Sequence, residues 1–266
     1  ADTMSEGDGG FGLPQMSEEE MFSLLLSEDT ERGDSEPPIA AGIGEQMLHM
    51  SLRPLPRSIR ARIRDISGRI PAKNVVLIGG GIGHLSAWLL DMWCGDPANP
   101  PETLPPKPDN FRIIEPGGKF GVIIDRLVRR HGAESWTQII QMPWNELAAE
   151  ATSWSAATAA LPQNAKPSPL PLPIDLVVVD VTEDERASTA KSAFDLLSSG
   201  GVLLVQEPEV PTGDVGVADS PSEMTPAQKK VESFNQWISF VKDVSENHSL
   251  GFVELTGGTL AVLRRA

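Results

Sequence analysis

The feature that most constrains this chain is a run of aliphatic residues that passes into closely spaced glycines and then into a helical pattern. The aliphatic run covers residues 75–78, and the glycines are Gly79, Gly80, Gly81 and Gly83. Glycine has no Cβ and accepts positive φ, so it suits a tight turn that comes close to a ligand. The free N–H groups of the following helix add partial positive charge at the same place. The pattern predicts a strand, a turn and a helix that hold a nucleotide or nucleoside-like cofactor.

Strands and helices alternate along the chain from residue 74 onward. The apolar runs that we expect to be strands cover residues 75–79, 111–115, 137–141, 174–180, 202–206, 251–255 and 259–263. Helical patterns separate the first five runs, which is typical of a parallel sheet covered on both faces. The last two runs flank Gly257-Gly258 and predict an antiparallel hairpin. We therefore predict an α/β fold with a doubly wound, mostly parallel sheet and an antiparallel C-terminal hairpin.

Composition divides the chain into three parts. Residues 1–40 form an acidic arm, because the first 38 residues hold eleven acids and one base, and such a composition favours flexibility. Residues 41–73 form a helical segment. Residues 74–266 form the α/β domain.

Both N-terminal parts contain helical patterns. Residues 16–26 are amphipathic and predict a short helix capped by Ser17. Residues 44–70 predict a longer helix, in which isoleucines recur at helical spacing and arginines occupy the other positions. This Arg-rich amphipathic helix is suited to bind an anionic surface or the acidic arm of the same chain, or it simply covers the domain.

Composition also excludes several classes of protein. No stretch approaches the roughly 18 uninterrupted apolar residues of a membrane span. The single cysteine, Cys94, excludes an intramolecular disulfide and a thiolate zinc cluster. The net charge of −15 gives nucleic-acid binding no electrostatic support. Residue 1 is alanine and no signal or basic transit sequence is visible, so we expect a soluble, processed or trimmed chain of the cytoplasm or an organelle interior, although the sequence does not specify the compartment.

Polar residues follow the predicted strands at their carboxyl ends. Glu115 ends the second strand, Gln141-Met142 the third, Asp180 the fourth and Gln206-Glu207 the fifth. Ligands of doubly wound sheets bind in the crevice outside the carboxyl ends of the strands. We therefore expect these residues to surround one crevice together with the glycine turn.

In the order and spacing of these motifs the chain resembles the class I S-adenosylmethionine-dependent methyltransferases over about residues 70–266. It is most similar to small O-methyltransferases of the catechol and caffeoyl-CoA type, which implies a seven-stranded methyltransferase-type sheet and S-adenosylmethionine as cofactor. In that family a Gly-x-Gly-x-Gly turn carries the methionine part of the cofactor, and it matches Gly79, Gly81 and Gly83. The acidic residue that binds the ribose hydroxyls corresponds to Glu115, since a carboxylate can accept hydrogen bonds from both.

Several positions depart from the family pattern. Leu77 replaces an acidic residue of the first strand, and Leu85 replaces a small or hydroxyl residue after the turn. Met142 stands where members have Asp or Asn near the adenine, and we expect it and Asp180 to contact the cofactor. Metal-dependent members have an Asp-Asn pair where this chain has Gln206-Glu207. Because a hard cation needs several oxygen ligands, we expect no metal.

The resemblance implies methyl transfer, most simply to an oxygen of a small or protein-bound acceptor. The candidates for a catalytic base are Asp180, Glu207 and His84. The alternative is a catalytically inactive methyltransferase-like subunit that joins a larger complex through the N-terminal arm and the Pro-rich insertions, which cover residues 95–108 and about 156–173. A dinucleotide-dependent oxidoreductase is disfavoured because its motif needs glycine at position 84. A spermidine synthase-like aminopropyltransferase is disfavoured because no paired acidic site follows the fourth strand.

Overall fold

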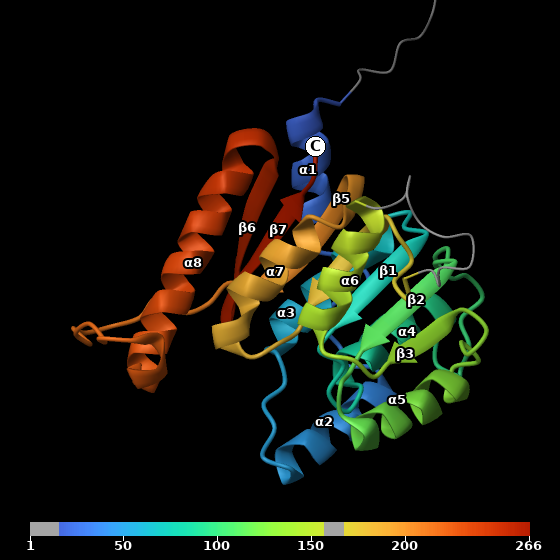
Figure 1. Cartoon of the computed structure of the whole chain (residues 1–266). Helices are drawn as coiled ribbons and strands as arrows, with labels where there is room; N and C mark the ends of the chain where they lie inside the picture. The colour runs from blue at the N-terminus through green and yellow to red at the C-terminus, as the bar shows by residue number, and fades with distance from the viewer. Residues whose placement is uncertain (1–15, 157–167) are drawn as a thin grey trace, which may run out of the picture.

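The computed structural model describes residues 16–156 and 168–266. Within these residues the strands form one sheet in the order β3-β2-β1-β4-β5-β7-β6 (Figure 1). The strands are β1 (Asn74–Ile78), β2 (Asn110–Ile114), β3 (Thr137–Ile140), β4 (Ile174–Val179), β5 (Leu197–Gln206), β6 (Ser249–Leu255) and β7 (Gly258–Arg264). Strands β1 to β5 pair in parallel, whereas β7 runs antiparallel to both of its neighbours. The predicted doubly wound sheet with its antiparallel C-terminal hairpin is confirmed.

The strand order reverses beside β1, at the centre of the sheet. The chain proceeds from β1 to β2 and β3 on one side and then returns to β4 on the other side of β1. At such a switch point a crevice opens outside the carboxyl ends of the strands. The glycine turn leaves β1 at this point, which explains why a ligand site is expected there.

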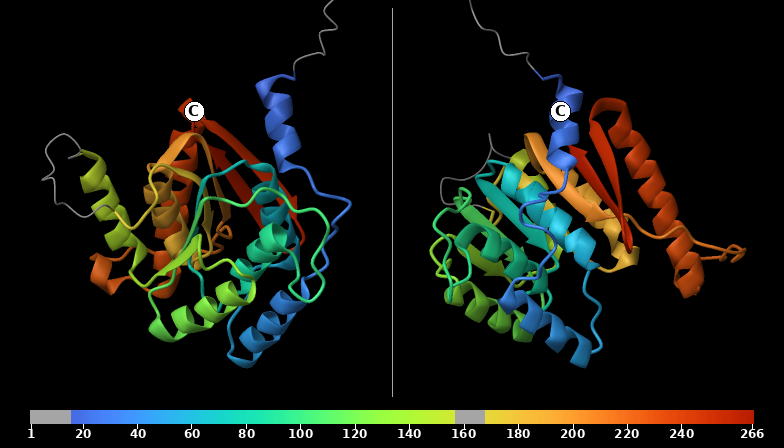
Figure 2. Two further views of the ribbon diagram at one scale, coloured as in Figure 1. Left: turned by 90° about the vertical axis from the view of Figure 1, so that its right-hand side faces the viewer. Right: turned by 180° about the vertical axis from the view of Figure 1, so that it is seen from behind.

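Helices cover both faces of the sheet (Figures 1 and 2). One face carries α3 (Arg57–Arg69), α4 (His84–Cys94) and α5 (Gly118–Arg130), and the other carries α6 (Trp144–Ala156), α7 (Arg186–Phe194) and α8 (Pro226–Asn247). Because side chains alternate along a strand, Val75 and Leu77 of β1 lie in the first core, and Val76 and Ile78 lie in the second. Burial on both sides explains why the strands are nearly all apolar.

The single helix predicted over residues 44–70 is in fact two helices, α2 (Pro38–His49) and α3. Residues 50–56 separate them. This interval contains Pro54 and Pro56, which lack an N–H group and disfavour helical backbone in the residue before them. Helix α2 also begins earlier than predicted, with Pro38 at its first position, where the missing N–H has no cost.

The short helix predicted within residues 16–26 is confirmed as α1 (Glu18–Leu26). Ser17 Oγ accepts a hydrogen bond from the Glu20 N–H at 3.1 Å, and the Glu20 carboxylate accepts one from the Ser17 N–H at 3.2 Å. This reciprocal capping box satisfies two otherwise unpaired donors at the helix start.

The chain between α1 and α2 runs beside α3, as the right-hand view of Figure 2 shows. Arginines of α3 hold it through main-chain oxygens: Arg62 Nη1 donates to Leu26 O at 2.8 Å, and Arg69 Nη1 donates to Ser27 O at 2.5 Å. The first 15 residues of the predicted flexible arm lie outside the described residues. The division of the chain at residues 40 and 73 stays a prediction.

Thr182 and, three residues later, Glu185 have the sequence pattern of a capping box, which predicts a helix from Thr182 to about residue 198. The observed helix is shorter. It begins with a 3-10 turn at Glu183–Glu185, and α7 ends at Phe194 because β5 already starts at Leu197. The Thr182 side chain makes no capping bond to the backbone, and its Oγ1 donates to Glu185 Oε2 at 3.1 Å instead. The capping box predicted there is wrong.

Candidate active site

The glycine turn between β1 and α4 consists partly of left-handed backbone. Gly79, Gly81 and Gly83 have φ angles of 92°, 55° and 98°, which cost a residue with a side chain about 1–2 kcal/mol. A Cβ at Gly79 would lie 1.9 Å from the Asp180 carbonyl oxygen, and one at Gly83 would lie 2.9 Å from Leu127 Cδ2. A Cβ at Gly81 would meet no atom of the described residues within 4 Å. Gly81 therefore borders open space, where a ligand can approach the backbone.

Glu115 follows β2 and faces the same turn. Its Oε2 accepts a hydrogen bond from the Gly81 N–H at 2.8 Å, and its Oε1 accepts one from the Gly117 N–H at 2.9 Å. Each carboxylate oxygen has two lone pairs, so each keeps one acceptor position. The residue is 8% exposed. Glu115 is thus a nearly buried carboxylate that is fixed against the turn and retains capacity for two hydrogen bonds.

Asp180 follows β4 and packs against the start of the turn. Its N–H donates to Ile78 O at 2.8 Å. The residue keeps part of its surface accessible, but its carboxyl group is desolvated. This desolvation raises the pKa of Asp180 to about 7, against the opposing effect of the Arg186 and Arg60 charges. A carboxyl group with such a pKa can take up and release a proton near neutral pH.

His84 is the first residue of α4 and belongs to a buried polar cluster with Glu36 and Arg60. His84 Nε2 lies 2.5 Å from Glu36 Oε1 and 2.9 Å from Arg60 Nη1, and Arg60 Nη1 donates to the same Glu36 oxygen at 2.6 Å. Burial lowers the pKa of His84, although its hydrogen bond to the Glu36 carboxylate opposes this shift. His84, 5% exposed, is thus a buried imidazole that is hydrogen-bonded beside the Arg60–Glu36 ion pair.

Glu207 and Met142 both contact the core. Glu207 Oε1 accepts a hydrogen bond from the Nε1–H of Trp237, a fully buried residue of α8. Glu207 thus anchors α8 to the end of β5. Met142 follows β3, is half-buried and packs against the core beneath α6 and α7. It forms an apolar wall at that strand end.

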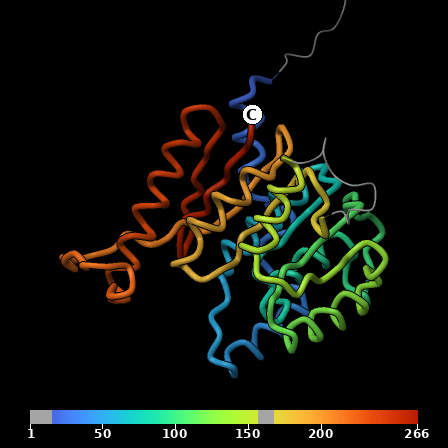
Figure 3. Tube along the Cα trace, in the orientation of Figure 1, coloured from blue at the N-terminus to red at the C-terminus, as the bar shows by residue number. Residues whose placement is uncertain are grey.

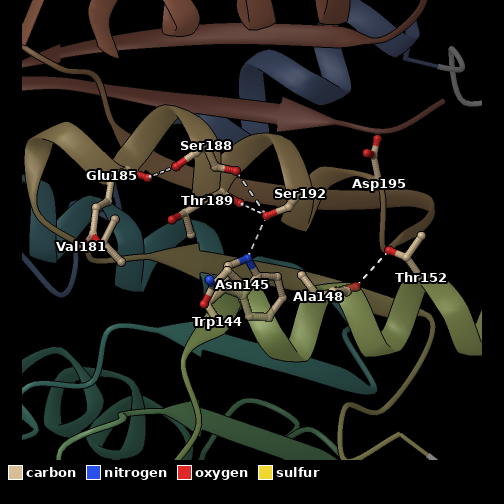
Figure 4. Close-up of a pocket in the computed structure, with 11 residues that line it drawn as sticks. Trp144, Asn145, Ala148, Thr152, Val181, Glu185, Ser188, Thr189, Ser192 and Asp195 are labelled. Carbon is tan, nitrogen blue, oxygen red and sulfur yellow. Dashed lines mark hydrogen bonds between the residues drawn. The ribbon is translucent and has the colours of Figure 1, made fainter. Parts of the chain in front are cut away.

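A groove with a volume of about 780 Å³ lies between α6 and α7 (Figure 4). Trp144 of α6 is 8% exposed, and its Nε1–H donates to Ser192 Oγ of α7 at 2.8 Å. Ser188 and Thr189 of α7 and Val181 after β4 line the same groove. The Trp144 side chain therefore joins the two helices, with its N–H already partnered.

Two other kinds of feature do not occur in the described part of the chain. Residues 16–156 and 168–266 contain no group of three or more His, Cys, Asp or Glu side chains that could hold a metal ion. No helix in these ranges has both the length and the apolarity needed to cross a membrane.

Burial raises the pKa of the Cys94 thiol to about 11, so this side chain is a neutral thiol.

The sequence does not distinguish Glu36 and Arg60 from their neighbours, yet the structure brings both together with His84. Glu36 is one of many acids in the N-terminal segment, and Arg60 is one of several arginines on α3. The available signal was the Arg-rich helix next to an acidic segment. Their contact shows that α3 binds one acidic residue of the N-terminal segment, Glu36, which is one of the three alternatives that the sequence left open.

No protein-family model and no curated protein matches the sequence. Solved structures match over most of the chain. The O-methyltransferase TomG from Streptomyces achromogenes, involved in tomaymycin synthesis and solved with SAM, is 16% identical with a TM-score of 0.57 over 92% of this chain and 95% of that chain. An O-methyltransferase from Bacillus cereus, solved with SAH, is 14% identical with a TM-score of 0.55 over 87% and 92%. The SAH-bound methyltransferase PaMTH1 from Podospora anserina is 14% identical with a TM-score of 0.54 over 96% and 99%.

At these low identities the likeness concerns the fold. The sheet order and the terminal antiparallel pair belong to the class I methyltransferase fold, as the sequence resemblance implied. The fold prediction is therefore confirmed by topology and by comparison.

Proposed function

We propose that this chain is a methyltransferase that uses S-adenosylmethionine and transfers the methyl group to an oxygen of a small-molecule acceptor. The observation that carries the proposal is the pairing of Gly81 with Glu115. Gly81 borders open space, and its N–H donates to a carboxylate that keeps free acceptor positions. Three structures of the same fold with bound SAM or SAH support this interpretation.

The residues around the turn fit the chemistry of this cofactor. Glu115 keeps one acceptor position on each oxygen, which matches the two ribose hydroxyls. The absence of a side chain at Gly81 leaves room beside the backbone N–H groups. Met142 offers an apolar surface to a planar base. Glu115, Gly81 and Met142 therefore form the proposed binding surface, together with Gly79, Gly83 and Asp180.

When bound, the cofactor supplies an electrophilic methyl group on a sulfonium sulfur. The residues of the chain orient the acceptor, exclude water and accept its proton. We assign the proton to Asp180. Its pKa of about 7 suits a base at neutral pH, and its carboxylate has no hydrogen-bond partner among the described residues. The other two candidates, His84 and Glu207, already bind Glu36 and Trp237.

The acceptor is proposed to be a small molecule because TomG acts in the synthesis of one. A protein-bound acceptor, and a complex formed through the N-terminal arm or the Pro-rich insertions, stay predictions.

Isothermal titration calorimetry with SAM and SAH tests the proposal. We expect both ligands to bind the wild-type chain, and Glu115→Gln to weaken both at least roughly tenfold. The amide would lose the charge that strengthens hydrogen bonds from the ribose. Glu146→Gln, which changes an exposed glutamate of α6, is the matched control and should bind as the wild type does.

No binding of either ligand to the wild-type chain would overturn the proposal and favour the inactive, structural alternative. Binding that Glu115→Gln leaves unchanged would contradict the assignment of Glu115 to the ribose. Methyl transfer to a panel of small phenols and hydroxy acids, with SAM as donor, then tests catalysis itself.

A further inference from the structure

The amino-acid end of the proposed cofactor carries a carboxylate and an ammonium group, and both need polar partners when they are desolvated. Two positions that could supply such partners are apolar in this chain. Leu77 of β1 is completely buried, Leu85 of α4 is 3% exposed, and both pack in the same hydrophobic core. These two positions therefore supply no polar side chain, and other charged side chains near the turn are candidates to replace them.

The N-terminal part places two charged side chains beside the glycine turn. Arg60 of α3 and Glu36, which precedes α2, both contact His84, the residue that follows Gly83. The backbone of α2 approaches the same cluster, because a Cβ at Gly44 would lie 3.1 Å from His84 Nε2. The segment between α1 and α2 that carries Glu36 runs beside α3 in Figure 2.

Contacts on two sides hold the Arg60 side chain in place. Its Nε donates to Leu55 O at 2.8 Å, and its guanidinium lies 5.5 Å from the centre of the Trp88 ring. The start of α3 is itself fixed at the turn of the C-terminal hairpin, where the Ser58 hydroxyl donates to Thr256 O. Arg60 is thus held in one orientation before any ligand binds.

Both charged groups keep one unused end. The hydrogen bonds of Arg60 use Nε and Nη1, and those of Glu36 use Oε1. Among the described residues, no hydrogen bond of normal geometry uses Arg60 Nη2 or Glu36 Oε2, although Trp88 also interacts with the Glu36 carboxylate and helps to lower its pKa. Neither atom is sealed in the interior. The side chains are 9% and 14% exposed. One donor group and one acceptor oxygen are therefore available side by side.

Arg60 also lies near Asp180, which follows β4 at its carboxyl end. The Asp180 carbonyl oxygen lies so close to Gly79 that a Cβ there would be 1.9 Å from it, so Asp180 packs directly against the glycine turn. Burial raises the pKa of Asp180, whereas the charges of Arg186 and Arg60 lower it. The Arg60 guanidinium is therefore close enough to interact electrostatically with the Asp180 carboxylate. Arg60 thus lies beside His84, the residue that follows the glycine turn, whereas Glu115 binds the Gly81 N–H within the turn.

We propose that Arg60 and Glu36 bind the amino-acid end of the cofactor. Arg60 Nη2 donates to its α-carboxylate, and Glu36 Oε2 accepts a hydrogen bond from its α-ammonium group. A guanidinium suits a carboxylate because its N–H groups match the two oxygens in one plane. This inference rests on the proposed function, and it makes the N-terminal segment part of the binding site.

Calorimetry with two ligands tests the inference: SAH and 5′-methylthioadenosine, which has the same nucleoside but no amino acid. The wild type should bind SAH at least roughly tenfold more tightly. Arg60→Lys and Glu36→Gln should each weaken SAH by a similar factor and leave methylthioadenosine within about twofold. Arg69→Gln, on the same helix but bonded only to Leu25 O and Ser27 O, should change neither affinity.

Thermal unfolding of each variant checks that it is folded, and the comparison of the two ligands on the wild type needs no variant. Equal wild-type affinities for SAH and methylthioadenosine would overturn the inference and leave the proposed function intact. Equal weakening of both ligands by Arg60→Lys or Glu36→Gln would also overturn it, because the residues would then act through the fold. A wild-type chain that binds neither ligand would overturn the proposed function itself.

Discussion

At the scale of single residues, the glycines of the turn between β1 and α4 differ in what surrounds them. Gly79 and Gly83 lie against neighbouring atoms, whereas Gly81 borders open space. The sequence alone cannot distinguish them, because the difference comes from residues far along the chain. Glu115 and Asp180 could be predicted, because both end strands whose carboxyl ends meet. The partners of His84 and Glu207 could not, because Glu36 and Trp237 approach them only through tertiary packing.

Alanine substitutions in the turn should separate stability from binding. Gly81→Ala should lower the free energy of unfolding by only about 1–2 kcal/mol, the cost of left-handed backbone. Gly79→Ala should lower it by more, because its Cβ also overlaps the Asp180 carbonyl oxygen. Gly81→Ala should nevertheless lose SAH affinity, since the new methyl group fills the open space. Urea denaturation and calorimetry measure the two effects. Full SAH affinity in Gly81→Ala would contradict this account of the turn.

At the scale of secondary structure elements, helix starts were the least predictable feature. Two threonines with similar sequence signals behave differently: Thr225 Oγ1 accepts a hydrogen bond from the Gln228 N–H at 3.2 Å, whereas Thr182 makes no such bond. The reason is the backbone that follows, since α8 starts directly but a 3-10 turn precedes α7. The burial of helix side chains was equally hard to predict. The arginines of α3 have the pattern of a solvent-exposed face, yet Arg60 and Arg64 are buried.

Removing the two threonine side chains should show this difference. Thr225→Ala should destabilise the protein by about 1 kcal/mol, because it removes the capping bond of α8. Thr182→Ala should change stability by less than about 0.5 kcal/mol, as expected of a surface side chain without a backbone partner. Chemical denaturation of both variants against the wild type measures the effect. A loss for Thr182→Ala as large as that for Thr225→Ala would show that the side chain of Thr182 caps α7 in solution.

At the scale of the whole molecule, the fold brings charged groups of distant segments into one buried region. Glu36, Arg60, His84 and Asp180 come from four separate parts of the chain. Burial of Asp180 costs stability whenever its carboxyl is ionised. The site therefore makes the stability of the whole fold depend on pH.

The variant Asp180→Asn should reveal this dependence. In the unfolded chain the Asp180 pKa is near 3.8, and in the folded chain it is about 7. Below about pH 4 the group is protonated in both states. As pH rises toward 7, only the unfolded chain loses the proton, so wild-type stability falls, by up to about 4 kcal/mol above pH 7. The gain from Asp180→Asn should thus grow from pH 4 to 8. Urea denaturation at several pH values measures it, and a gain independent of pH would refute the raised pKa.

The class of fold and the expected place of the candidate site follow from the sequence alone. Strand and helix periodicity predicts the doubly wound sheet, and the carboxyl ends of parallel strands align Glu115 and Asp180 with the glycine turn. These are local patterns, or consequences of topology that hold for any sheet of this kind. Which side chains remain available depends on tertiary packing. His84 and Glu207 acquire partners, and Glu36 and Arg60 reach the turn, because packing joins segments whose separation along the chain carries no signal.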